Sequence, residues 1–167
     1  MRHIDVRDLL EHPGTARTVH VAEAVPGLHT ELAEVPPETP IAGDLTLESV
    51  VEGVYVTGSV AGRMAMRCAR CLTEFDRGFD VQMHEMFVRE PGPEDDYVLP
   101  PDLMLDPEPM VRDAVVLEMP FAPLCKPDCL GLCERCGGDR NLGECTCAER
   151  TDPRWAALER FTETSEP

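Results

Sequence analysis

A long run of alternating hydrophobic and polar positions extends from about residue 43 to residue 88. Alternation with a period of two is typical of a β-strand with one buried and one exposed face. Gly58 and Gly62 interrupt the pattern, and we expect a bulge or bend there. The pattern predicts an antiparallel β meander in which the buried positions are Val54, Val56, Val60, Met64 and Met66, followed by Phe79, Val81, Met83 and Phe87.

Shorter elements flank the meander. A short strand around His3–Val6 leads into a turn of helix near Asp8–Glu11, and Arg17–Val21 alternates as a further strand. The proline-rich residues 36–40 are expected to form a loop. Residues 89–104 are acidic and proline-rich, which predicts an exposed loop.

Two helix starts follow this loop. Asp106 is a suitable N-cap, Pro107 suits the first helical position, and Glu108 suits the first turn. The helix has an apolar stripe and ends before Pro120. A second start at Asp152-Pro153 predicts a short C-terminal helix. The apolar stripes of the two helices are Met110, Val111, Ala114, Val115 and Leu117, and then Trp155, Leu158 and Phe161.

The predicted fold class is therefore α+β. It combines an antiparallel β meander, a packed helix, a cysteine-rich zinc-knuckle tail and a short C-terminal helix. We expect an α+β core domain over residues 1–120, a cysteine-rich zinc-binding segment over 121–150, and a C-terminal helix and tail over 151–167.

The 167-residue chain is strongly acidic, with a formal net charge of -17. Acidity of this size repels a phosphate backbone and favours basic protein partners, although it also serves simply to keep a protein soluble. The first residues contain no apolar stretch of a secretory signal, and no segment approaches a membrane span. A cytoplasmic location is therefore expected, where cysteine thiols stay reduced.

Eight cysteines fall into two groups, and their spacing favours structural zinc. A Cys-x-x-Cys pair can place two sulfurs on one tetrahedral ion, and a closed structural site needs four such ligands. The first pair follows the first long strand, and the other six cysteines lie in one glycine-rich stretch. The predicted ligands are Cys68 and Cys71, followed by Cys125, Cys129, Cys133, Cys136, Cys145 and Cys147.

Eight ligands fit two zinc sites, and two partitions remain open. The one we favour joins the last four cysteines in a local site, since Gly137-Gly138 and Gly143 let the chain turn back on itself. Cys68, Cys71, Cys125 and Cys129 then form a second site that ties the end of a strand to the segment after the helix. The alternative joins Cys125 and Cys129 with Cys133 and Cys136 and leaves the other four together.

Other cysteine chemistry and catalysis are alternatives with less support. Disulfides conflict with the reducing cytoplasm, and no βαβ pattern of a thioredoxin-like redox site surrounds Cys68. Iron–sulfur ligation by four cysteines stays an alternative to zinc. A catalytic zinc would keep an open position and use histidine or a carboxylate, yet the histidines are scattered and no motif of catalysis occurs. We therefore predict a protein that is not an enzyme; its histidines are His3, His12, His20, His29 and His84.

The cysteine-rich stretch resembles the YceD family of large ribosomal RNA subunit accumulation proteins. The run from Pro123 to Gly137 is similar to the family signature, as is its continuation through Asn141-Leu142, Cys145-Thr146-Cys147 and Asp152-Pro153-Arg154. The similarity covers roughly residues 45–162 and includes Cys68 to Leu72. Glu134 stands where a proline is usual and Gly143 where asparagine is usual, but neither difference removes a cysteine.

The resemblance implies a non-catalytic role in the synthesis, processing or stability of large-subunit (23S) ribosomal RNA. It implies as partners this RNA or its precursor, in direct or indirect contact. The setting of ribosome biogenesis also implies an alternative, in which the chain is an acidic binding partner or chaperone of a basic large-subunit ribosomal protein. Residues 85–118 support that alternative, because they hold ten acidic side chains against Arg89 and Arg112.

Direct RNA contact would need a basic surface, and the first cysteine pair offers the best candidate. Four arginines surround it, opposed only by Glu74 and Asp76. Arginines bind phosphates and stack on unpaired bases, although solvated ion pairs beside an acidic sheet are the alternative. The candidate RNA-binding residues are Arg63, Arg67, Arg70 and Arg77.

Overall fold

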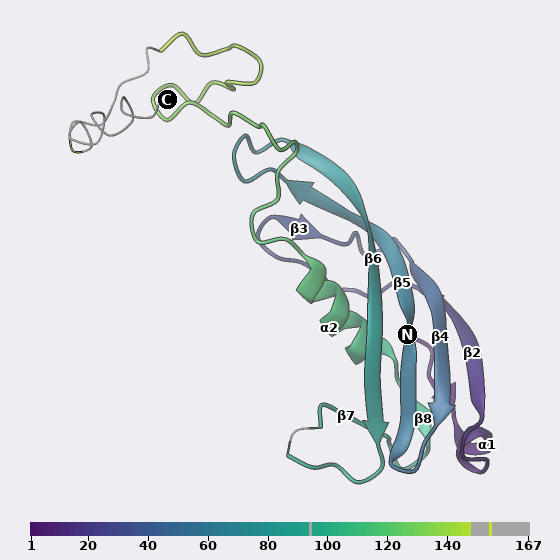
Figure 1. The fold of residues 1–167 in the computed structure, drawn as a ribbon. Coiled ribbons are helices and arrows are strands. Elements are labelled where there is room, and N and C mark those ends of the chain that lie inside the picture. The colour runs from purple at the N-terminus through teal and green to yellow at the C-terminus, as the bar shows by residue number, and fades with distance from the viewer. Residues whose placement is uncertain (94, 148–153, 155–167) are drawn as a thin grey trace, which may run out of the picture.

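The computed structural model of the chain describes residues 1–93, 95–147 and 154. Three long antiparallel strands form the centre of a curved sheet (Figure 1). Consecutive strands are joined by short turns, and pairing runs without interruption from Gly53 opposite Val88 to Arg67 opposite Glu74. The predicted meander is confirmed, with its strands at β4 (Ile41–Ser49), β5 (Gly53–Arg67) and β6 (Glu74–Val88).

Shorter strands extend the sheet. β2 (Ala16–Glu23) pairs antiparallel with β4, and β3 (Ala33–Glu34) pairs antiparallel with the end of β5. A separate two-stranded sheet joins the N-terminal segment to the residues before the main helix. It consists of β1 (Ile4–Asp5) and β8 (Met104–Leu105), and α1 (Arg7–Leu10) follows β1. The predicted N-terminal strand, helical turn and strand are all present.

The helix α2 (Glu108–Glu118) covers one face of the sheet (Figure 1). As expected, the Asp106 carboxylate accepts a hydrogen bond from the backbone N–H of Glu108, which satisfies a free donor of the first turn. The buried side of α2 joins the same core as the alternating apolar side chains of β4, β5 and β6. The buried helix residues are Met110, Val111 and Val115.

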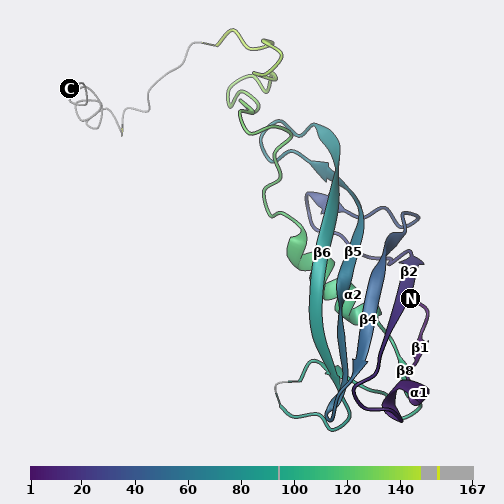
Figure 2. The same cartoon turned by 45° about the vertical axis from the view of Figure 1, so that its right-hand side comes forward.

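The opposite face of the sheet is open within the described part of the chain, and Figure 2 shows it with α2 lying behind the strands. Strand alternation fills this face with small and polar side chains, because residues opposite each other in register share a face. It includes Thr18 and His20 of β2, Asp44 and Thr46 of β4, Thr57 and Ser59 of β5, and Gln82 and His84 of β6.

The predicted exposed loop over residues 89–104 is confirmed for residues 89–93, 95 and 96, but it is wrong for the residues that follow. Residues Tyr97–Val98 form β7, which pairs parallel with the end of β6 and makes the sheet mixed. Tyr97 stacks on Phe87 with ring centroids 5.3 Å apart and donates a hydrogen bond to Asp113 at 2.8 Å. Leu99 is buried. The ring of Tyr97 and the buried side chain of Leu99 hold this segment in place. A strand of two residues is too short to show a periodic pattern in the sequence.

Of the bulge or bend predicted at Gly58 and Gly62, no bulge is present, because both residues sit in unbroken register. These glycines instead admit a close neighbour. A Cβ on Gly58 would lie 2.1 Å from the carbonyl oxygen of Asp44, and one on Gly62 would lie 2.7 Å from the ring of Phe79. The sheet does bend along these strands (Figure 1).

The predicted C-terminal helix that begins at Asp152-Pro153 lies, apart from Arg154, outside the described residues. Among the described residues, no helix combines the length and the apolar character needed to cross a membrane.

Candidate metal centres

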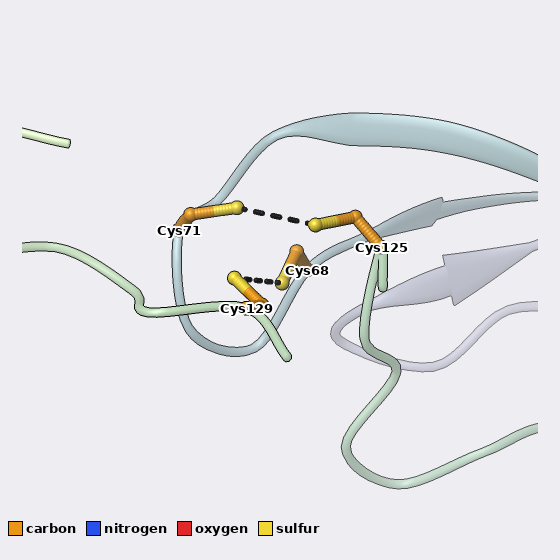
Figure 3. A group of neighbouring side chains, drawn as sticks. All are labelled: Cys68, Cys71, Cys125 and Cys129. Atoms are coloured by element: carbon orange, nitrogen blue, oxygen red, sulfur yellow. Dashed lines mark hydrogen bonds between the residues drawn. The ribbon is translucent and has the colours of Figure 1, made fainter. Parts of the chain in front are cut away.

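The turn between β5 and β6 presents the first two cysteines. It is closed by backbone hydrogen bonds from Cys68 to Thr73 (2.9 Å) and from Leu72 to Cys68 (3.0 Å). Leu72 has a φ of 61°, a left-handed conformation that reverses the chain directly after Cys71. Both thiols therefore lie on the same side of the turn, as Figure 3 shows.

The segment after α2 brings two further cysteines to this turn. Ala69 donates a backbone hydrogen bond to Pro123 (2.8 Å), and Leu132 donates one to Arg70 (3.0 Å). These contacts hold the intervening chain against the turn from both ends. The group of Cys68, Cys71, Cys125 and Cys129 that results is largely buried.

The sulfur geometry of this group fits a tetrahedral metal ion. The Sγ atoms of Cys68 and Cys129 are 3.8 Å apart, and those of Cys71 and Cys125 are 3.6 Å apart. All four sulfurs lie within 4.8 Å of one another. Zn–S bonds of 2.3 Å at tetrahedral angles require sulfurs about 3.8 Å apart, whereas a disulfide requires about 2.05 Å. The thiols are free in this structure.

Hydrogen-bond donors around the sulfurs favour the thiolate form of Cys68 and Cys71. Burial opposes ionisation of Cys68, but backbone N–H groups from Cys125, Cys71 and Arg70 outweigh it and lower the Cys68 pKa to about 6. Hydrogen bonds from the hydroxyl and backbone of Thr73 lower the pKa of Cys71. By contrast, burial and the adjacent sulfurs raise the pKa of Cys125 to about 12. A divalent cation at the centre would let all four ionise, because it offsets the repulsion between thiolates.

The second group contains the other four cysteines, all within the glycine-rich stretch: Cys133, Cys136, Cys145 and Cys147. Its first turn is closed by hydrogen bonds from the Cys133 N–H to Gly138 (2.9 Å) and from the Gly137 N–H to Cys133 (2.8 Å). Gly137 and Gly143 have φ values of 71° and 72°, which a side chain would disfavour. These sulfurs also lie within 4.8 Å of one another.

The second group has the same electrostatic pattern as the first. Backbone N–H groups of Cys136 and Arg135 lower the pKa of Cys133 to about 6. The neighbouring sulfurs of Cys136 and Cys145 raise the pKa of Cys147 to about 12. In the part of the chain that the structure describes, both groups of metal-ligating side chains contain cysteine alone. Four thiolates and no histidine or carboxylate match a closed structural site rather than a catalytic one.

The four candidate RNA-binding arginines do not share one face. Arg63 and Arg67 are exposed on the open face of the sheet, where Arg67 pairs with Glu74 at 3.2 Å. Arg77 lies on the opposite face, since it is in register with the buried Met64. It donates to the Leu124 carbonyl (3.3 Å) and stacks over Phe75, while Arg70 donates to the Cys129 carbonyl (2.8 Å).

Asn141 is a contributor that the sequence interpretation missed. Its side-chain N–H lies 3.5 Å from the Cys129 sulfur, and its side-chain oxygen accepts a hydrogen bond from the Leu130 N–H at 2.9 Å. Asn141 thus links the segment of the second group to the first group. An N–H donor to a ligand sulfur orients that ligand and stabilises its thiolate. The family signature included Asn141, but the signature alone does not show which ligand the side chain contacts.

Comparison with known proteins shows which family the chain is similar to. A family model described as "Large ribosomal RNA subunit accumulation protein YceD" matches residues 56–162. An uncharacterized protein of Mycobacterium tuberculosis is 36% identical over 162 residues, covering 93% of this chain and 78% of the relative. An uncharacterized protein of Mycobacterium leprae is 34% identical over 163 residues, covering 92% and 74%.

A more distant relative is the uncharacterized protein YlbN of Bacillus subtilis. It is 27% identical over 108 residues, covering 62% of this chain and 63% of YlbN. No solved structure matches the chain.

Proposed function

Because the chain belongs to the YceD family, we propose that it acts in the cytoplasm as a non-catalytic factor in the synthesis, processing or stability of large-subunit (23S) ribosomal RNA. The observation that carries this proposal is the extent of the family match. It includes most of β5, all of β6 and α2, and all eight cysteines. The matched region therefore contains both the centre of the fold and both cysteine groups.

The two cysteine groups are proposed to hold one structural zinc ion each. The ligands would be Cys68, Cys71, Cys125 and Cys129 in the first site, and Cys133, Cys136, Cys145 and Cys147 in the second. Zinc would supply no reaction at such sites. It would stabilise the turn between β5 and β6 and the segment after α2 in one arrangement.

Arg63 and Arg67 are the proposed RNA-contacting residues. Both are exposed, and they project from the same face of β5 beside the first cysteine group. A guanidinium there can reach a phosphate or stack on an unpaired base. Arg70 and Arg77 instead bond to backbone carbonyls around the first group, so their primary role in this proposal is to position it.

A crosslinked pull-down of the tagged protein from growing cells, in which RNA and protein are recovered together, tests the proposal. We expect large-subunit precursor RNA to survive denaturing washes. The double variant Arg63→Glu with Arg67→Glu should lose this RNA while remaining folded. The matched control is Arg2→Glu with Arg89→Glu, since both arginines are exposed and the charge change is the same. Equal RNA recovery from both double variants would contradict the arginine assignment.

A second candidate function is that of an acidic binding partner for a basic large-subunit ribosomal protein. It is favoured by a hollow of about 430 Å³ on the open face beside β3. Four carboxylates line this hollow against the single cation Arg67: Glu31, Glu34, Glu74 and Asp76. The same pull-down distinguishes this candidate, which predicts recovery of a basic ribosomal protein and loss of RNA after nuclease treatment. Such a complex should dissociate as salt rises, because exposed charges are screened within about 10 Å at 0.1 M.

A further inference from the structure

The last turn of α2 and the segment after it expose three large apolar side chains within six residues of chain. We refer to Val116, Leu117 and Phe121 as the α2 apolar patch. Leu117 is 87% exposed and Phe121 is 97% exposed. Neither side chain contributes burial to this fold, since the apolar contacts of α2 with the sheet come from its other side. The three residues lie close together in the chain, and neighbouring exposed apolar groups are typical of interaction sites.

Two carboxylates of α2 flank Leu117 along the helix, and one of them, Glu118, lines a small hollow together with the cation Arg77. Asp113 lies one helical turn before Leu117, and Glu118 follows it directly. The Asp113 carboxylate accepts a hydrogen bond from the Tyr97 hydroxyl at 2.8 Å. The pKa of Tyr97 is raised, first by burial and then by Asp113, with smaller contributions from Glu85 and Asp96. The neighbouring cation Arg112 already donates to Glu108 at 2.8 Å.

Charge decides between the occupants that such a patch could take. A second copy of the chain would bring a net charge of -17 against a chain of the same net charge, and like charges in contact disfavour that interface. RNA is disfavoured for the same reason. A basic polypeptide is attracted by these carboxylates, and an apolar side on it would cover the patch.

We propose that the α2 apolar patch binds an amphipathic, basic segment of a partner protein. Apolar side chains of the segment would cover Val116, Leu117 and Phe121, and its lysines or arginines would contact Asp113 and Glu118. This inference deepens the second candidate function and rests on it for the class of partner. It adds a second binding surface, on the other face of the sheet from the carboxylate-lined hollow, and the requirement that the partner has an apolar side as well as positive charge.

The test uses the full-length, zinc-loaded protein and synthetic peptides of about 18 residues, which is long enough for five helical turns. One labelled peptide places leucines on one helical side and lysines on the other; a second has the same composition in scrambled order. Binding is measured by fluorescence anisotropy for the wild type, for Leu117→Ser with Phe121→Ser, and for Val51→Ser. Val51 is a matched control because it is 85% exposed and lies in the turn between β4 and β5, away from α2.

We expect the amphipathic peptide to bind the wild type and the Val51→Ser variant equally, and the double variant about tenfold more weakly or worse. The scrambled peptide should bind weakly to all three. Equal binding of the amphipathic peptide by the double variant would overturn the patch assignment while leaving the acidic-partner function standing. Failure of every protein to bind a lysine peptide at low salt would overturn that function as well.

The other occupants give distinct outcomes. If a second copy covers the patch, sedimentation analysis of the same three proteins should show a dimer for the wild type and for Val51→Ser but not for the double variant. If the proteins crosslink to a single-stranded RNA oligonucleotide and only the double variant loses this crosslinking, the patch binds RNA. Either outcome would overturn the proposal, and a monomer with unchanged RNA crosslinking in all three proteins supports it.

Discussion

Gly43 and Gly58 show why some positions of the sheet accept no side chain. A Cβ on Gly43 would lie 1.9 Å from the carbonyl oxygen of Ser59, and one on Gly58 would lie 2.1 Å from that of Asp44. Both obstacles are backbone atoms of the adjacent strand, which cannot move aside without disturbing the ladder between β4 and β5. Glycine is therefore required by space at these positions, where the strands approach each other closely.

Replacing Gly58 by alanine is expected to destabilise the fold by about 3 kcal/mol. The added methyl group must displace the backbone around Asp44, and overpacking of this kind carries a cost of that order. Urea unfolding followed by circular dichroism measures the change. Gly78→Ala is the matched control, since Gly78 is also a strand glycine but the nearest atom to its Cβ is the Gly62 carbonyl oxygen at 3.7 Å. Equal destabilisation by the two substitutions would contradict the steric argument.

The candidate arginines show the limit of residue-level prediction. Sequence proximity grouped Arg63, Arg67, Arg70 and Arg77 around one cysteine pair. In register, however, Arg63 and Arg67 lie on the open face and Arg77 lies on the other. Arg70 and Arg77 donate to carbonyls of a segment more than forty residues away in the chain. Composition predicts that positive charge is present, but only tertiary contacts determine which guanidinium is engaged.

At the scale of elements, the turn between β5 and β6 joins the sheet to the cysteine-rich segment. Phe75 at the start of β6 packs against both the main core and the small core formed by Cys68, Cys71 and Cys129. The second cysteine group has no such connection to the sheet among the described contacts, and Cys136 in it is exposed. The two groups should therefore affect the strands differently.

The variant Cys71→Ser is expected to loosen the ends of β5 and β6, whereas Cys136→Ser should loosen only the segment around the second group. A lost ligand weakens its metal site, and only the first site shares packing with the sheet through Phe75. Hydrogen exchange read by mass spectrometry should show exchange about tenfold faster or more in the affected amides. Leu142→Ser, at an exposed position in the cysteine-rich segment, is the control and should change neither region.

Prediction from sequence succeeded for elements with a strong repeating signal. The two-residue period predicted the long strands and their buried positions, and the Asp106, Pro107 and Pro120 signals predicted the limits of α2 closely. β7 was missed because a two-residue parallel strand is held by tertiary contacts of Tyr97 and Leu99. The close approach at Gly58 was not predicted, since glycine suits a bulge, a bend and a close approach alike.

At the scale of the whole molecule, the structure contains a large apolar core and a much smaller cysteine core. The large core is shared by α2 and the strands, while the small one is formed by the first cysteine group. Cysteine spacing left two partitions into sets of four sulfurs open, and the structure gathers the sets of the favoured one. Spacing could not predict that Asn141 and Arg70 would support the first set, because those contacts depend on how the segment after α2 returns to the turn.

Because the large core contains no cysteine ligand, removal of zinc should leave the sheet folded. We expect the purified protein to release two zinc ions per chain to a chromogenic chelator, with far-UV circular dichroism retaining its β signal. Acid should also release the metal. Without the ion, the pKa values of Cys68 and Cys133 are already lowered to about 6, and a bound cation lowers them further, so protons should displace the ion only at a pH well below 6.

The controls for this experiment are the two ligand variants, since Cys71→Ser and Cys136→Ser should each retain a single zinc ion per chain. Visible absorption together with bound iron would indicate that the sites hold an iron–sulfur cluster instead of zinc. A single ion in the wild type would contradict the two-site assignment. Loss of the β signal together with the metal would show that the sheet depends on zinc, and the separation into two cores would then be wrong.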